Sequence, residues 1–269
     1  MNMSKKYKYL LGSLFVLGSF STLNAELAAT PESYYENAIG FLKQDNKDVS
    51  KAFAEMKKSA DLGYAKAQAN LALLYAMGVG TEKNLTESFR LYTLAANQGN
   101  ATAQRYLGAY YALGIAVEKN VAEAVKWTVM AANQGDAKAL YNLSVFLDKG
   151  IGVEKNDAKA LDCLVKSASL GEADAQLDLG VRYLAGAGVE KNELESFNWI
   201  KKAAEQGNLQ AIFNLGVYYD RAIGTEKNNK LSLHCFDVAA KNGHKQAIEV
   251  LKNLEARINA EKAKAQEAK

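Results

Sequence analysis

The chain has 269 residues, of which 49% are hydrophobic and 23% charged, a balance that excludes an intrinsically disordered protein. The formal charge is +3, but three of the 33 basic residues, Lys5, Lys6 and Lys8, lie in a leader without acidic residues, and the other 30 equal the 30 acidic residues. A neutral remainder gives no electrostatic reason to expect nucleic acid or an anionic membrane as a partner, because both are bound chiefly through basic patches.

Residues 1–25 have the pattern of a secretory signal peptide. A basic start is followed by an apolar run from Leu10 to Phe20 and by a small residue, Ala25, before Glu26. The apolar run is too short to span a bilayer as a helix. We expect cleavage near Ala25 and a periplasmic or secreted mature protein without an integral membrane segment; an uncleaved anchor is the alternative.

Residues 26–62 are interpreted as a degenerate N-terminal capping repeat. The sequence Thr30-Pro31-Glu32 is a good helix start, since proline is favoured at the first helical position. The segment lacks the Gly-x-Gly turn of the copies that follow. Such atypical ends are expected in a solenoid, because a terminal unit shields apolar surface on one side only.

Residues 63–243 contain five copies of a 36-residue unit, and the degenerate segment brings the total to about six. Glycines recur at a constant spacing of 36 residues: Gly63, Gly99, Gly135, Gly171, Gly207 and Gly243. Regular spacing of this kind indicates stacked supersecondary units. Each copy contains a helical segment, a turn that is usually Gly-x-Gly, and a second helical segment. The sequence therefore predicts an all-α solenoid of helix-turn-helix repeats.

The first helical segment of each copy has a core stripe. An alanine is followed four residues later by a leucine, and usually four later again by a tyrosine, as in Ala67, Leu71 and Tyr75. Residues at this spacing share one helix face. Small residues beside the stripe are expected to let the second helix approach closely: Ala72, Gly108, Ser144, Gly180 and Gly216.

The residues of the turn in each copy predict how the first helix ends and how the second helix is capped. Gly78, Gly114, Gly150 and Gly186 can adopt the left-handed conformation that ends a helix. Asparagine then stands at the start of each second helix, at Asn84, Asn120, Asn156, Asn192 and Asn228. Glutamate follows three residues after three of them, which resembles a capping box with asparagine as the cap.

Residues 244–269 repeat the first helix and continue as a charged, alanine-rich segment. We interpret them as a C-terminal capping helix with a charged tail.

The repeat resembles the Sel-1-like repeat, a relative of the tetratricopeptide repeat. The pattern is Ala-x-x-x-Leu-Gly-x-x-Tyr-x-x-Gly-x-Gly-Val, then Lys-Ala or Glu-Ala, Trp and Ala-Ala-x-x-Gly, and the copies at 99–135 and 171–207 fit it best. Ala116, Ala222 and Leu147 depart from the pattern and are expected to distort local turns at most. The resemblance implies a right-handed αα-superhelix acting as a scaffold or adaptor. Exported bacterial members are associated with host interaction or envelope assembly.

Candidates for catalysis are few, so no enzyme and no cofactor is predicted. His234 and His244 do not form a ready metal pair. Cys163 and Cys235 occupy equivalent positions two repeats apart, beyond disulfide reach, and are predicted to be buried free thiols. Cysteine-rich relatives are described as binding or hydrolysing β-lactams, and a β-lactam-binding or β-lactamase-like envelope protein is the alternative function. The chain lacks their cysteine pairs and the Ser-x-x-Lys, Lys-Thr-Gly and Gly-x-Ser-x-Gly motifs.

A second apolar face on the first helices is the predicted partner site. In solenoids the first helices line the concave side, so this face is a candidate groove for a protein or peptide of unknown identity. The alternative is that its residues pack first helices of neighbouring repeats together. The candidate partner-binding residues are Arg105, Tyr141, Asn142, Val145, Leu177, Val181, Phe213, Asn214 and Val217. Polar residues one position along would bind a peptide backbone at the groove edge, or alternatively would only form hydrogen bonds with neighbouring turns: Asn70, Asn142, Asp178 and Asn214.

Overall fold

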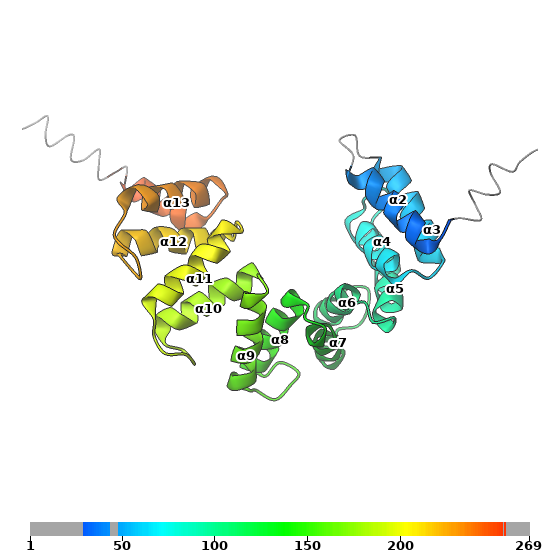
Figure 1. The fold of residues 1–269 in the computed structure, drawn as a ribbon, viewed down its shortest axis with the longest axis horizontal. Helices are drawn as coiled ribbons and strands as arrows, with labels where there is room; N and C mark the ends of the chain where they lie inside the picture. Colours follow the sequence, from blue (N-terminus) through cyan, green and yellow to red (C-terminus); the bar gives the residue numbers. More distant parts are fainter. Residues whose placement is uncertain (1–28, 44–47, 255, 257–269) are drawn as a thin grey trace, which may run out of the picture. The chain divides into compact units, whose positions relative to one another are not determined.

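The structure is a computed structural model that describes residues 29–43, 48–254 and 256. These residues form α-helices joined by turns, with no β-strand among them (Figure 1). The predicted all-α repeat fold is therefore confirmed. The helices are α2 (Pro31–Lys43), α3 (Val49–Asp61), α4 (Ala65–Met77), α5 (Leu85–Asn97), α6 (Ala101–Leu113), α7 (Val121–Asn133), α8 (Ala137–Lys149), α9 (Asp157–Ser169), α10 (Ala173–Ala185), α11 (Glu193–Glu205), α12 (Leu209–Arg221) and α13 (Asn229–Lys241).

The chain divides into two compact units between Leu91 and Tyr92, inside α5. In the first unit, α2 packs against α3 and α3 packs against α4. In the second unit, every helix from α6 to α13 packs against the next one along the chain. The even-numbered helices α4 to α12 are the first helices of their repeats. The odd-numbered helices α5 to α13 are the second helices.

The alanine and leucine stripe of the first helices lies in the core, as predicted. Ala103 and Leu107 on α6, and Ala175 and Leu179 on α10, are at most 1% exposed. Burying one such leucine contributes roughly 1.5–3 kcal/mol. Each helix is therefore stabilised mainly by the neighbours that cover its apolar face.

The small residues beside the stripe permit close helix packing, also as predicted. A Cβ atom on Gly108 would lie 2.8 Å from Thr128 Oγ1 and 3.1 Å from the carbonyl oxygen of Ala124, both on α7. A Cβ on Gly216 would lie 2.8 Å from the ring of Phe236 on α13. Side chains at these two positions would push the paired helices apart.

The asparagines cap the second helices, but the capping box is only half formed. The side-chain oxygen of Asn120 accepts a hydrogen bond from the backbone N–H of Glu123 at 3.1 Å, and Asn84, Asn156, Asn192 and Asn228 accept equivalent bonds. The backbone N–H of Asn120 donates to the carbonyl of Tyr111 instead of to a glutamate. The Glu123 carboxylate pairs with Lys126 at 3.1 Å. The turn itself satisfies the amide that a capping box would leave to glutamate.

The turns that depart from the glycine pattern keep the same backbone. Gly78 closes α4 with φ 70° and ψ 36°, and Ala222 closes α12 with φ 57° and ψ 40°. Ala116 has a φ of 55°. The expected local distortion is therefore absent at Ala222, and its cost is instead the strain of a Cβ atom in the left-handed region.

At the C-terminal end, residues 245–254 are helical, in the segment predicted to cap the solenoid. Residues 255 and 257–269 of that segment, and the predicted signal peptide, lie outside the described residues. None of the helices in the described part of the chain combines the length and the apolar character needed to cross a bilayer.

Candidate functional site

A groove of about 450 Å³ lies on the first helices of the second unit. It is lined by residues of α6, α8 and α10, together with Thr128 of α7 and Leu164 of α9. We call it the first-helix groove. Its volume falls within the range of about 300–1,000 Å³ typical of ligand pockets.

The groove is hollow because α6 contributes small residues to it. Gly108, Ala109 and Ala112 line the α6 side, where larger side chains would fill the space. Val145 and Phe146 of α8 add further apolar surface to the lining. The floor is therefore largely apolar, which is typical of surfaces that bind side chains of a partner.

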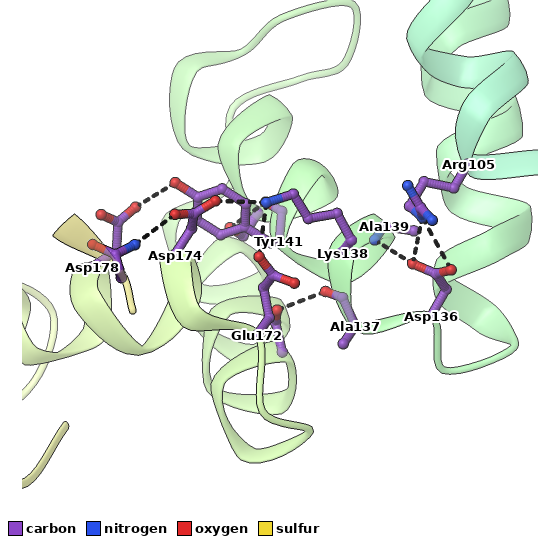
Figure 2. Close-up of polar contacts among 12 residues, drawn as sticks. Arg105, Asp136, Ala137, Lys138, Ala139, Tyr141, Glu172, Asp174 and Asp178 are labelled. Carbon is purple, nitrogen blue, oxygen red and sulfur yellow. Dashed lines mark hydrogen bonds and ion pairs between the residues drawn. The ribbon is translucent and has the colours of Figure 1, made fainter. Parts of the chain in front are cut away.

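One wall of the groove carries charged and polar groups from α8 and α10. The Tyr141 hydroxyl donates a hydrogen bond to Asp178 Oδ2 at 3.0 Å (Figure 2). Arg182 Nη2 forms an ion pair with Asp148 Oδ1 at 2.8 Å. Burial raises the pKa of the Asp178 carboxyl, although its bond from Tyr141 and the charge of Arg182 partly oppose the shift. Burial, together with the neighbouring Asp178 carboxylate, raises the pKa of Tyr141.

A second polar network joins consecutive repeats beside the groove. Figure 2 shows the Lys138 ammonium between the carboxylates of Glu172 and Asp174. Lys138 Nζ lies 2.7 Å from Glu172 Oε1 and 2.6 Å from Asp174 Oδ2. Asn208 donates to the other oxygen of Asp174 at 2.9 Å. Lys138 also lies over the Tyr141 ring, 5.5 Å from its centroid. The positive charge of Lys138 is thus already engaged by two carboxylates of the next repeat.

The structure brings three of the predicted site residues together. Tyr141, Asn142 and Val145 all line the first-helix groove. Val181 lies on α10, 45% exposed, but is not part of the groove lining.

The remaining predicted site residues lie elsewhere, several of them in contacts between repeats. Arg105 Nε lies 3.1 Å from Asp136 Oδ1, the cap of α8 (Figure 2). Leu177 packs against the core cluster that contains Ile200 and Leu215. The Phe213 ring stacks on the His244 ring, with 4.5 Å between the two ring centroids. Asn214 accepts a hydrogen bond from Gln210 at 2.9 Å, and Val217 is partly buried.

Sequence reasoning missed several groove residues. From the sequence, Gly108 is assigned to helix packing, Ala112 has no assigned role, and the Asp148–Arg182 pair is not predicted; Ala109 lies on the second apolar face but is not among the predicted partner-binding residues. The spacing of that pair in the sequence could have predicted it. Its members are 34 residues apart, which is close to the repeat length, so they fall on neighbouring first helices.

The two cysteines are buried and free, as predicted. Burial raises the pKa of both thiols, which makes thiolate chemistry less accessible at neutral pH. In the described part of the chain, no group of three or more His, Cys, Asp or Glu side chains is arranged to hold a metal ion.

Comparison with known families gives five consecutive matches. The model of the Sel1 repeat matches residues 65–100, 101–136, 137–172, 173–208 and 209–244. Each match begins with a first helix and ends shortly after a second helix. No curated protein matched the chain in sequence.

Solved structures give the same picture. A Sel1 repeat protein from Oxalobacter formigenes is 30% identical, with a TM-score of 0.76 over 86% of this chain and 68% of that one. The c5321 protein, a protective antigen present in uropathogenic Escherichia coli strains, is 26% identical, with a TM-score of 0.67 over 87% of this chain and 51% of the antigen. The immunity protein Pa5087 from Pseudomonas aeruginosa, at 22% identity and a TM-score of 0.55 over 78% of this chain and 81% of that one, shares the fold.

Proposed function

Because the chain belongs to the Sel1 repeat family, we propose that it is a scaffold that holds a segment of a partner protein in the first-helix groove. Sel1 repeats are typical of protein–protein interaction, and proteins built from them are generally non-enzymatic scaffolds. The observation that carries the proposal is the groove itself, a hollow of about 450 Å³ with an apolar floor and a polar wall.

The groove has the chemistry that a peptide requires. Apolar side chains of a partner would cover Ala109, Ala112 and Val145 and remove their surface from water. Asn142 also lines the groove, and within the described residues its carboxamide makes no hydrogen bond. A carboxamide offers both a donor and an acceptor, which is the pair that a peptide backbone presents.

The exposed residue Leu113 gives the groove a natural probe position. It lines the groove and is 71% exposed, so a different side chain can be placed there without disturbing the core. Leu194 on α11 is 58% exposed and lies outside the groove, so it serves as a matched control.

The experiment places a photo-reactive benzoylphenylalanine at Leu113 or at Leu194 in cells of the source organism. Illumination is expected to cross-link a defined partner peptide at Leu113 and none at Leu194, as identified by mass spectrometry. Val145→Asp should abolish the adduct without changing the circular dichroism spectrum. Adducts that form equally at both positions, or that survive Val145→Asp, would show that the partner does not occupy the groove.

The proposal includes export, to the periplasm or beyond the cell. Its support is the signal-like leader at residues 1–25, and the likeness to a protective antigen is consistent with a role in host interaction or envelope assembly. Cell fractionation and N-terminal sequencing test it. We expect the mature chain to begin at Glu26 in the periplasmic or secreted fraction; a full-length chain confined to the cytoplasm would contradict export.

A further inference from the structure

The carboxylate of Asp178 lines the groove and forms no ion pair with any of the described residues, although the charge of Arg182 acts on it. Its hydrogen bond comes from the neutral hydroxyl of Tyr141, at 3.0 Å. Arg182 stands four residues later on the same helix, but its ion pair is with Asp148 at 2.8 Å. Among the described residues, no ion pair involves Asp178.

The other charges near Asp178 do not neutralise it. Asp174 and Asp148 are the further acidic groups that act on it, and each makes its ionisation less favourable. Lys138, the nearest lysine of α8, is engaged by Glu172 and Asp174. The remaining lysine of the lining, Lys149, stands at the end of α8, eight residues and about 12 Å along the helix from Tyr141. The Asp178 end of the groove therefore has an excess negative charge.

Resting on the proposed function, we propose that the bound segment of the partner carries a lysine or arginine flanked by apolar residues, and that this side chain pairs with Asp178. The cation would complete the charge balance of the wall, while the flanking side chains would cover Ala109, Ala112 and Val145. The bond from Tyr141 holds the carboxylate in place before binding, so little further ordering is needed.

The strength of this pairing follows from its surroundings. Asp178 is partly buried, and burial raises the pKa of its carboxyl. An ammonium or guanidinium group that donates to such a carboxylate forms a charge-assisted hydrogen bond, about twice as strong as a neutral one. The apolar side chains of the bound segment would shield that bond from water, which would strengthen it further.

The test selects phage-displayed random twelve-residue peptides on the purified full chain and measures the affinities of the selected peptides by fluorescence anisotropy. We expect enrichment of sequences with one lysine or arginine between apolar residues. Replacing that lysine by norleucine, which keeps the alkyl chain and removes the charge, should weaken binding about tenfold or more. Val145→Asp should block binding of every selected peptide.

Variants of the chain identify the partner of the cation. Asp178→Asn should weaken the lysine peptide about tenfold and leave the norleucine peptide almost unchanged, so that the preference for lysine disappears. Asp178→Glu should keep the preference, and Asp162→Asn, a change of an exposed aspartate on α9, should change neither affinity. Thermal unfolding checks that each variant is folded.

The outcomes separate this inference from the proposed function. Peptides that compete for the groove without a cation preference, or that lose equal affinity with lysine and norleucine on Asp178→Asn, would overturn the role of Asp178 and leave the scaffold proposal standing. If Val145→Asp leaves the binding of all selected peptides intact, the groove is not the binding site and both proposals fail.

Discussion

Tyr141 on α8 and Asp178 on α10 are joined by a 3.0 Å hydrogen bond that connects the first helices of two consecutive repeats. Tyr141 lies within the apolar face that the sequence marked as a partner site, and Asp178 lies at its edge. The bond shows that this face has two structural roles. Its side chains tie neighbouring repeats together, and the same side chains form the wall of the first-helix groove.

Tyr141→Phe is expected to destabilise the protein by roughly 1–2 kcal/mol, because it removes the hydroxyl that satisfies a partly buried carboxylate. Urea denaturation monitored by circular dichroism measures the change. Tyr183→Phe is the matched control, since the Tyr183 ring packs against the same core cluster and its hydroxyl makes no hydrogen bond among the described residues. Equal effects of the two substitutions would rule out a specific contribution from the Asp178 bond.

Asp178 is expected to make the stability of the protein depend on pH. Burial raises the pKa of its carboxyl above the ordinary value of 3.8, despite the opposing effects of Tyr141 and Arg182. Just above pH 3.8 the folded state therefore binds more protons at this site than the unfolded state does. The contribution of Asp178 to stability then falls as the pH rises through this window.

Asp178→Asn removes this titration. The free energy of unfolding of the variant minus that of the natural chain should therefore be larger at pH 7 than at pH 4. Thermal unfolding of both proteins at the two pH values measures the difference. A stability difference between the two proteins that is constant across this range would contradict the raised pKa.

Gly108→Ala is expected to destabilise the protein by up to about 2 kcal/mol. Alanine favours the helix by about 1 kcal/mol, but its Cβ would lie 2.8 Å from Thr128 Oγ1, and overpacking of this kind costs about 1–3 kcal/mol. Gly40→Ala in α2 is the control, because no atom lies within 4 Å of its added Cβ. That substitution should stabilise by about 0.5–1 kcal/mol. The two unfolding temperatures should therefore move in opposite directions.

Tyr92→Phe is expected to leave stability unchanged or to increase it. The Tyr92 hydroxyl is buried and has no hydrogen-bond partner among the described residues, so its removal relieves an unsatisfied group. Tyr218→Phe should instead cost about 1–3 kcal/mol, because the Tyr218 hydroxyl lies 2.6 Å from Ser196 Oγ in the core. Ser196 donates its own proton to Gly180, so Tyr218 donates to Ser196. A larger loss at Tyr92 than at Tyr218 would refute this account.

The sequence by itself determined the repeat, its helix pair and its turns. The bonds that end and begin these helices join residues a few positions apart, such as Asn120 to Glu123, so a pattern repeated every 36 residues predicts them directly. The burial of Leu107 and the close approach at Gly108 follow in the same way from position on the helix face.

Only the tertiary structure decided what becomes of the second apolar face. Equivalent positions differ in their outcome: Tyr141 lines the groove, Leu177 packs into the core, and Phe213 stacks on His244. Their helix positions are the same, but side-chain size and charge on the neighbouring repeat differ, and these set whether a space is filled or left open. The groove exists because small residues of α6 face the larger ones of α8, a contact between helices that helix periodicity does not encode.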